Sequence, residues 1–365
     1  MQVLKLRLIN FRNFIFEDFE FSKYKNIIIG NNGMGKTNII EAIYFLALTK
    51  SFRTTEETSL ININNEFAVI KGEFKTNTTN EYKIIIEKPG KKVFINNQHI
   101  KRLSDYISKI NIILFNKEDL KLIKDSPSTH RKLINMELSQ LNNEYLKILS
   151  NYNKILKHRN TYLKSMQINN IIKKDYLFIL TDKLIDLGIK IYNWRKDYID
   201  EINTTLNKNF NKITKKDGIF LKYNSDYNNL TKEKLLKKYE KDFQRDLNYG
   251  KTNFGIHLDD FIFYYKKRLA KDYLSEGEQK NVVISFKLAE VNIFYKKTKT
   301  MPILILDDLF SELDTIKINR IINFFKKNIQ IFITTTDLNN IDKKILSNSK
   351  VFRIKGKTIE VKEYD

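Results

Sequence analysis

The sequence predicts an α/β protein whose largely parallel sheet is assembled from both chain ends, with a mostly helical domain inserted between them. Apolar segments typical of buried strands occur near both ends: NIIIG (26–30), NIILF (111–115), MPILILDDLF (301–310) and IQIFITTTD (329–337). Helical patterns separate these strands, which favours a parallel arrangement. The middle of the chain shows a long helical periodicity instead.

The first 115 residues predict strands, one helix and a β-meander. Before NIIIG, strands are expected at VLKLRLINF (3–11) and FEDFEFS (16–22), and a helix is expected from Lys36 to about Leu48. Residues 60–99 predict a meander, with a turn at Pro89-Gly90. Its strands are ININ (61–64), FAVIKGEFK (67–75), EYKIIIEK (81–88) and KKVFIN (91–96). A short helix near 101–109 then leads to NIILF.

The helical middle contains no proline between Pro127 and Pro302. Large side chains recur at alternating spacings of three and four from Leu138 to Met166, and again from Leu177 to Tyr198. Two amphipathic helices joined by a break at QINN (167–170) predict an antiparallel hairpin. The stripe of Tyr and Trp along these helices indicates core packing between them rather than a base-stacking surface.

The predicted domain order follows from these sequence patterns. Residues 1–115 form the first part of the α/β domain, residues 116–244 the inserted helical domain, and residues 245–365 the second part. In that last part a helix is expected to begin near Glu278, and another covers TIKINRIINFFKK (315–327).

Composition narrows the functional classes. The 365 residues contain no cysteine and only four histidines, which excludes disulfides and disfavours a zinc site. No segment is long and apolar enough to predict a membrane helix or a signal peptide, so an intracellular soluble protein without a membrane role is expected. The net charge of +22 favours a polyanionic partner such as nucleic acid. A lysine-rich composition from AT-rich codons is the alternative explanation.

A phosphate site is predicted at GNNGMGKT (30–37), which matches the P-loop pattern after an apolar strand and before a helix. Glycines let backbone amides turn inward around a β-phosphate, and the helix N-terminus adds positive charge. Lys36 is expected between the β- and γ-phosphates, and the Thr37 hydroxyl on Mg²⁺. The residues predicted to hold ATP are Gly30, Asn31, Asn32, Gly33, Met34, Gly35, Lys36 and Thr37.

Two adjacent acids complement this loop. Asp307 ends the hydrophobic strand ILILD and is expected to hold the Mg²⁺. Asp308 follows it and is expected to orient or polarise the attacking water. Aspartate is one methylene shorter than the glutamate usual at such a position, which predicts a slow hydrolysis that acts as a switch.

A second anion site is predicted at LSEGE (274–278), where Ser275 and Gly277 precede a helix. The loop resembles the signature loop of ABC-type ATPases. In that superfamily's head-to-tail dimer, each signature loop caps the γ-phosphate held by its partner's P-loop. The resemblance implies an ATP-dependent homodimer with two ATP molecules at its interface, in which Ser311-Glu312-Leu313-Asp314 crosses the dyad.

Further segments, in order along the chain, extend the resemblance to the RecF family. They are LRLINFRNF, GNNGMGKTNIIEAIYFLALTKSFRT, FNKEDLKLIKDSP, RKLINMELSQ, YLKILSNYNKILKHRN, RDLNYGKTNFGIHLDD, YLSEGEQKN, PILILDDLFSELD, QIFITTTD and VFRIKGKTIEV. Together they span almost the whole chain. The fold that the resemblance implies is an SMC-like ATPase head, carrying the β-meander, plus the helical arm.

The family resemblance also implies a function. A bacterial, cytoplasmic and nucleoid-associated protein is expected, which dimerises around ATP on DNA and cooperates with RecO and RecR in loading RecA at gaps. Roles in replication recovery and the SOS response follow. DNA contact, with double strands, single strands or gap junctions, would be sequence-independent, because no helix-turn-helix or zinc-finger pattern occurs. Arg12 is implied to contact the nucleotide, as in related heads.

The chain departs from the family's pattern at several positions. Ile256 and Leu258 replace the usual Pro and Arg of a GPHRDD stretch. After the Ser-Pro turn the family has two consecutive arginines, and His130 replaces the first of them. Glu276 and Glu278 stand where the family often has glutamine. Thr334 begins three threonines where many ABC ATPases place a histidine, which leaves the γ-phosphate sensor open.

Two other functional classes remain open on the motifs alone. A transporter engine is disfavoured because the signature loop lies far along the chain from the P-loop, beyond a helical arm. An SMC-like ATPase of a defence or other DNA-processing system would be expected to carry a fused effector, for which the motifs leave little room.

Overall fold

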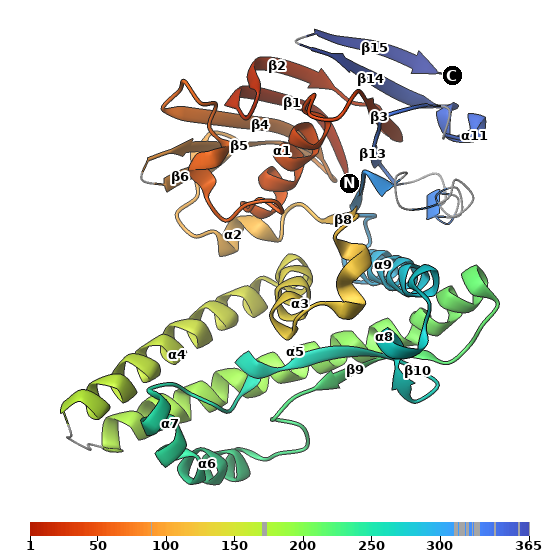
Figure 1. The fold of residues 1–365 in the computed structure, drawn as a ribbon. Helices are drawn as coiled ribbons and strands as arrows, with labels where there is room; N and C mark the ends of the chain where they lie inside the picture. The colour runs from red at the N-terminus through yellow and green to blue at the C-terminus, as the bar shows by residue number, and fades with distance from the viewer. Residues whose placement is uncertain are drawn as a thin grey trace. The chain divides into compact units, whose positions relative to one another are not determined.

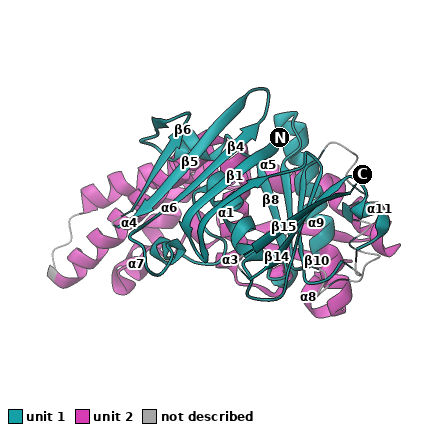
Figure 2. Cartoon of the chain, turned by 90° about the horizontal axis from the view of Figure 1, so that it is seen from above, with its two compact units in different colours: residues 1–121, 283–365 teal, residues 122–282 magenta. Residues whose placement is uncertain are grey.

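The computed structural model describes residues 1–365 except 89, 170–173, 310–312, 314–317, 319–320, 323, 325–328, 339–340, 357 and 365. The chain divides into two compact units, coloured separately in Figure 2. Unit 1 comprises residues 1–121 and 283–365, and unit 2 comprises residues 122–282. Unit 1 is therefore assembled from both chain ends.

The division between the units lies at 121/122 and 282/283, whereas the sequence predicts 115/116 and 244/245. The second difference has a clear structural origin. Strand β10 (Asp260–Tyr265) pairs antiparallel with β9 (Ile219–Asn224) along its whole length, and β11 (Arg268–Leu269) extends this sheet. The pairing attaches the segment after residue 245 to unit 2. This small sheet was not predicted.

The parallel sheet of unit 1 has the strand order β15-β14-β3-β13-β12-β8 (Figure 1). Its strands are β3 (Lys25–Ile29), β8 (Ile112–Asn116), β12 (Ile303–Asp307), β13 (Ile331–Thr335), β14 (Ser349–Lys355) and β15 (Thr358–Tyr364). All neighbours are parallel except β14 and β15, which form an antiparallel hairpin at the edge. The four predicted strands are confirmed, and the hairpin was missed.

The second sheet of unit 1 is antiparallel, with the order β2-β1-β4-β5-β6-β7. Its strands are β1 (Gln2–Phe11), β2 (Phe14–Glu20), β4 (Phe67–Lys75), β5 (Thr79–Glu87), β6 (Gly90–Ile95) and β7 (Gln98–His99). The predicted meander is confirmed except for ININ. There, only Ile61 bridges to Phe11. The Asn62 side chain instead donates to the Arg12 carbonyl, and Ile63 is 93% exposed.

Helix α1 (Lys36–Leu48) contacts strands of both sheets and is buried on all sides beyond its first turn. Its sequence IIEAIYFLAL is apolar almost throughout, as expected for a helix without a solvent face. The predicted bounds are confirmed. A short α2 (Ser104–Ile107) and the 3₁₀ segment η1 (Glu57–Leu60) complete the N-terminal part.

The helical part of unit 2 is built on α3 (Pro127–Leu141), α4 (Asn143–Asn169) and α5 (Lys174–Thr214). Figure 1 shows α4 and α5 side by side in opposite directions, which confirms the predicted hairpin. The prediction of one continuous helix from Leu138 to Met166 was wrong, because α3 ends at Leu141 and α4 begins at Asn143. Asn142 is extended, and its side-chain oxygen caps α4 by accepting from the amides of Glu144 and Tyr145.

Core packing explains most of the aromatic stripe, as predicted. Tyr145, Tyr152 and Tyr198 are fully buried. Two arginines on the same helices are buried as well. Arg159 pairs with Asp246 at 2.8 Å and Arg195 with Asp259 at 2.7 Å, so each buried charge has a partner.

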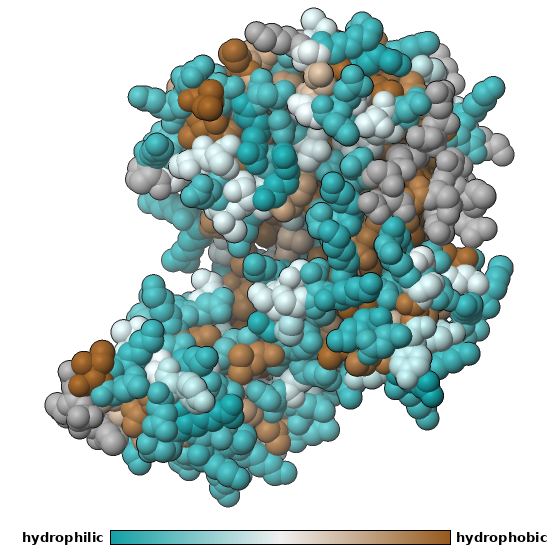
Figure 3. Space-filling view, in the orientation of Figure 1, coloured by the Kyte–Doolittle hydropathy of each residue, from teal (hydrophilic) through white to brown (hydrophobic). Residues whose placement is uncertain are grey.

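The remaining described helices are α6 (Lys232–Lys241), α7 (Phe243–Tyr249), α8 (Ala270–Tyr273), α9 (Glu276–Thr298), α11 (Lys343–Leu346), and the 3₁₀ segments η2 (Asp119–Lys124) and η3 (Ile256–Leu258). Most of the predicted helix 315–327, and Ser311, Glu312 and Asp314 of the predicted dyad loop, lie outside the described residues. Among the described helices, none is long and apolar enough to cross a membrane. On the face shown in Figure 3, hydrophilic side chains predominate and hydrophobic ones form small separate patches.

Candidate functional site

The loop between β3 and α1 holds the predicted phosphate-binding residues. The Gly30 amide donates to the Thr335 carbonyl of β13 at 3.4 Å. A Cβ atom at Gly30 would lie 2.9 Å from the Ile354 carbonyl oxygen, so a larger residue would force the backbone to move. Gly33 and Gly35 have φ of +82° and +96°, which glycine adopts without strain. The glycines of the motif are therefore required by this backbone.

Lys36 opens helix α1, and its side chain turns back over the loop. Nζ donates to the carbonyl oxygens of Gly30 at 2.6 Å and Asn31 at 3.0 Å. Burial lowers the pKa of Lys36, while the carboxylates of Asp308 and Asp307 oppose that shift. The ammonium group is therefore held inside the loop, where the motif requires a point charge for the phosphates.

The predicted acids lie with Thr37 at the end of β12. The buried Oδ1 of Asp307 accepts from the Thr37 hydroxyl at 3.3 Å and from the Thr334 hydroxyl at 2.7 Å. Asp308 has φ of +54°, and its amide donates to the Thr334 hydroxyl oxygen at 2.8 Å. One threonine thus fixes both acids. The structure brings Lys36, Thr37, Asp307 and Asp308 together as the sequence predicts.

The chemistry of these groups fits a magnesium ion. A hydroxyl and a carboxylate are oxygen donors of the kind that Mg²⁺ prefers. Burial raises the pKa of Asp307, despite the hydrogen bonds from Thr334 and Thr37 that lower it. A divalent cation would stabilise the ionised carboxylate that burial disfavours. Thr37 and Asp307 therefore form a suitable pair of ligands.

Arg12, in the turn between β1 and β2, is held by a buried acid. Glu41 of α1 has no exposed surface and accepts from Arg12 Nε at 2.9 Å and Nη2 at 2.8 Å. The hydroxyl of Ser51 and the guanidinium of Arg53 also donate to Glu41. Arg12 Nη1 donates to the Ser59 carbonyl at 2.9 Å. This cluster fixes two arginines close to the first turn of α1.

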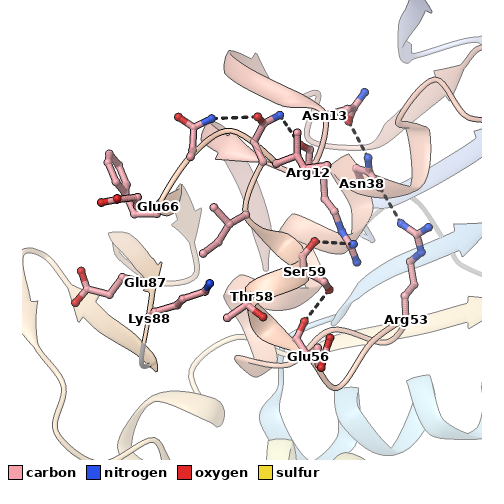
Figure 4. A pocket seen from close by; sticks show the side chains of 15 residues that line it. Arg12, Asn13, Asn38, Arg53, Glu56, Thr58, Ser59, Glu66, Glu87 and Lys88 are labelled. Carbon is pink, nitrogen blue, oxygen red and sulfur yellow. Dashed lines mark hydrogen bonds between the residues drawn. The ribbon is translucent and has the colours of Figure 1, made fainter.

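A cavity of about 1230 Å³ opens beside this cluster (Figure 4). Asn38 Nδ2 donates to Asn13 Oδ1 at 2.7 Å, and Arg53 donates to Asn38 Oδ1 at 2.8 Å. Asn13 Nδ2 in turn donates to the Met34 carbonyl of the phosphate loop. The cavity that Arg12 lines is thus connected to the phosphate loop by direct hydrogen bonds. Its other polar residues include Glu56, Glu66, Glu87 and Lys88.

The signature-like loop lies in unit 2, where Ser275 precedes α9. Ser275 and Gly277 are exposed. The Ser275 amide and hydroxyl donate to Glu278 Oε2 at 2.9 Å and 2.8 Å, and the Glu278 amide lies 3.4 Å from the Ser275 hydroxyl oxygen. This reciprocal arrangement is a capping box. The donors predicted to meet a phosphate are bonded to an acid of their own chain.

The GIHLDD stretch has a structural role within unit 2. His257 Nδ1 lies 2.9 Å from the Tyr152 hydroxyl. Asp259 pairs with Arg195, and Asp260 Oδ1 lies 2.7 Å from His130 Nδ1. His130, which departs from the family's arginine, is therefore a partner for Asp260 inside the unit.

Sequence reasoning missed several residues of the site. Thr334 was noted only as a departure, and Glu41, Arg53, Asn13 and Asn38 were not singled out. An acid inside the apolar segment IIEAIYF was the available signal for Glu41, because a buried carboxylate needs a cationic partner. For the asparagines no signal was available, since their contacts join the turn at Asn13, helix α1 and the segment at Arg53, which are far apart in sequence.

Comparison with known proteins adds relatives that span the chain. The family model described as RecF/RecN/SMC N terminal domain matches residues 2–360. A DNA replication and repair protein RecF from Lactobacillus gasseri is 36% identical over 373 residues, covering 100% of this chain and 100% of its own. Another, from Halalkalibacterium halodurans, is 35% identical and covers 99% of this chain.

Solved structures resemble the whole chain as well. One, described as the recombination mediator protein RecF-ATP in the RecFOR pathway, has a TM-score of 0.91 at 26% identity and covers 99% of this chain and 97% of its own. An Smc head bound to the C-winged helix domain of ScpA has a TM-score of 0.54 at 17% identity, covering 99% of this chain and 96% of its own. The second likeness concerns the fold alone.

Proposed function

The chain belongs to the RecF family, and on that premise we propose that it is an ATP-dependent DNA-binding protein of recombinational gap repair. In this role it dimerises around ATP on DNA and helps RecO and RecR load RecA, which links it to replication recovery and the SOS response. The observation that carries the proposal is the cluster of Lys36, Thr37, Asp307 and Asp308 in a chain similar to RecF over its full length.

ATP would be bound by the phosphate loop and the cavity beside it. The loop that begins at Gly30 and runs to Gly35 offers backbone amides beyond Gly30 to the β-phosphate, and Lys36 offers its ammonium group to the β- and γ-phosphates. The cavity lined by Arg12 and Arg53 has room for the rest of the nucleotide, and its hydrogen bonds to the loop support this assignment. Magnesium held by Thr37 and Asp307 would neutralise phosphate charge.

Hydrolysis would be slow and serve as a switch. Asp308 is the group proposed to orient the attacking water, and the Thr334 hydroxyl fixes its backbone. The backbone of Asp308 lies in the left-handed region, which aspartate adopts more readily than most residues, and this sets the direction in which its side chain leaves the end of β12. A short aspartate that reaches the water poorly is consistent with low turnover.

Dimerisation would complete the nucleotide site. Ser275 and Gly277, at the N-terminus of α9, are proposed to meet the γ-phosphate bound by a second copy. Because each copy supplies one half of each site, the interface is isologous and its affinity depends on the nucleotide.

DNA contact would be sequence-independent. The net charge of +22 supplies many Lys and Arg side chains for phosphate contacts. Such binding weakens steeply as the salt concentration rises.

Binding to DNA tests the function directly. A gapped duplex and a blunt duplex of equal length are titrated with the protein across a salt series, with ATP and with ADP. The proposal predicts the tightest binding for gapped DNA with ATP, and a steep loss of affinity with salt. Equal affinity in all four combinations would contradict the repair function while leaving the family assignment intact.

A further inference from the structure

The capping box at the start of α9 leaves the signature serine engaged with a carboxylate. Ser275 uses both its amide and its hydroxyl as donors to one oxygen of Glu278. Under the proposed function, these two donors serve the γ-phosphate of a partner's ATP. Carboxylate and phosphate oxygens are both anionic acceptors that bind the same donors. A phosphate can therefore take the Ser275 donors only if Glu278 releases them.

A lysine from a distant part of unit 2 holds the same carboxylate. Lys216, two residues after the end of α5, donates from Nζ to Glu278 Oε1, the oxygen that Ser275 does not use. The two oxygens of Glu278 are thus divided between a cation and the signature serine. Hydrogen bonds from Lys216 and Ser275 lower the pKa of Glu278 to about 2, so the group is ionised at neutral pH.

The other acid of the same turn is arranged differently. The Glu276 side chain is 77% exposed and lies 3.6 Å from Lys280, one turn further along α9. Glu276 and Glu278 carry the same charge near the same helix N-terminus, but only Glu278 is bonded to Ser275. A comparison of the two acids therefore separates the effect of a negative charge near the loop from the effect of a carboxylate bonded to Ser275.

We propose that Glu278 is a built-in competitor of the γ-phosphate for the Ser275 donors, and that Lys216 is a positioning residue which takes over the carboxylate when the phosphate arrives. The inference rests on the proposed ATP-dependent dimer and adds a step that regulates dimerisation. Association would require the phosphate to displace the Glu278 carboxylate from Ser275. The dimer would therefore be weaker than one in which the Ser275 donors are not already bonded.

Lys216 has two effects that act in the same direction. It keeps a partner for the carboxylate after Ser275 turns to the phosphate, which lowers the cost of release. It also neutralises a negative charge close to an incoming one. Loss of Lys216 should therefore weaken the ATP-dependent dimer, and the effect should be larger while Glu278 remains an acid.

The first test compares Glu278→Gln with Glu276→Gln in the full chain. Glutamine still forms a capping box, so α9 keeps its cap while the competing charge is removed. Sedimentation with magnesium and a non-hydrolysable ATP analogue gives the dimer dissociation constant. The constant should fall roughly tenfold for Glu278→Gln, because a neutral acceptor binds donors more weakly than a charged one. For Glu276→Gln it should change by less than about twofold, as for an exposed charge.

The second test measures coupling between the two positions. Lys216→Met should raise the dimer dissociation constant, and it should do so much less when Glu278→Gln is already present. Lys215→Met removes an equal charge from the preceding position and is the matched control. A role confined to folding would change melting temperature equally in both backgrounds, so thermal unfolding of each monomer without nucleotide is measured in parallel.

The outcomes separate this inference from the proposed function. If the unaltered chain dimerises with the analogue and Glu278→Gln matches Glu276→Gln, the competition is refuted and the dimer stands. The competition is also refuted if Lys216→Met changes the dimer dissociation constant by the same factor with glutamate and with glutamine at position 278. If neither the unaltered chain nor any variant dimerises, the proposed dimer fails and the inference fails with it.

Discussion

Two helices of this protein begin at loops predicted to meet phosphate, and their N-termini are prepared in opposite ways. Helix α1 begins after Gly35, with Lys36 as its first residue and no acid in its first turn. Helix α9 begins after Ser275, with Glu276 and Glu278 in its first turn. The amides of both N-termini attract anions. At α1 the chain adds a cation, and at α9 it adds anions.

The difference indicates two kinds of phosphate binding. A glycine loop with a buried lysine favours a phosphate as soon as a nucleotide is present. A serine already bonded to its own carboxylate favours a phosphate only when that carboxylate gives way. Under the proposed function, a single copy would bind nucleotide without rearrangement. Association of two copies would require Glu278 to release Ser275 first.

The largest effect is expected at α1. Lys36→Met removes the ammonium group that lies against the Gly30 and Asn31 carbonyls. ATP affinity should fall by about 100-fold or more, because a charged contact is lost in a buried position. Isothermal titration with Mg-ATP measures it. Retained affinity would show that the loop does not bind phosphate as proposed.

The next effect is expected at α9. Ser275→Arg places a long cation where the small serine caps the helix, and it should abolish ATP-dependent association. ATP affinity of the single copy should stay within about threefold, because the phosphate loop is untouched. Sedimentation and titration are measured on the same sample, with Ser275→Ala as a milder control. A dimer of Ser275→Arg at normal affinity would exclude a role for this loop at the interface.

Helix α1 also carries an acid in its second turn, Glu41, which has a structural role, whereas Glu278 of α9 is proposed to be regulatory. Glu41 is buried and accepts from Arg12, Ser51 and Arg53. Glu41→Gln should lower the free energy of unfolding of the chain by about 2–3 kcal/mol, because Arg12, whose side chain is only 19% exposed, loses a fully buried charged acceptor.

Urea denaturation measures that loss, with Glu56→Gln as the control, because Glu56 is an exposed acid that lines the neighbouring cavity. Glu278→Gln should cost much less than Glu41→Gln. Equal losses at the two positions would remove the distinction between a structural and a regulatory acid.

The smallest effect concerns pH. The pKa of Glu278 is lowered from 4.5 to about 2, chiefly by Lys216 and then by Ser275. A depressed carboxylate contributes stability above its ordinary pKa, and that contribution is lost as the pH falls from about 4.5 through about 2. The difference in stability between the unaltered chain and Glu278→Gln should therefore shrink across this range. A constant difference would contradict the ion pair.

The loop between β3 and α1 could be placed from sequence because its parts are local. Gly30 to Thr37 are contiguous, and their strand and helix follow from apolar pattern alone. The capping box could also have been recognised, since Ser275 and Glu278 have the S-x-x-E spacing. The parallel sheet was predictable because its strands are short apolar segments between helices.

Other features depend on contacts that no local pattern reveals. Thr334 joins Asp307 and Asp308 across two strands, and Lys216 reaches Glu278 from a distant segment. The wrong strand at ININ shows the same limit. Its alternation is that of a strand, yet the Asn62 side chain binds the Arg12 carbonyl and turns the chain.

Whether ATP joins two copies of this chain can be measured with Asp308→Asn, because this variant should stall hydrolysis without removing nucleotide binding. Sedimentation velocity at micromolar protein compares saturating Mg-ATP with Mg-ADP. A dimer with ATP and single copies with ADP are the predicted result. Single copies in both nucleotides, with ATP binding verified by titration, would show that ATP does not join two copies.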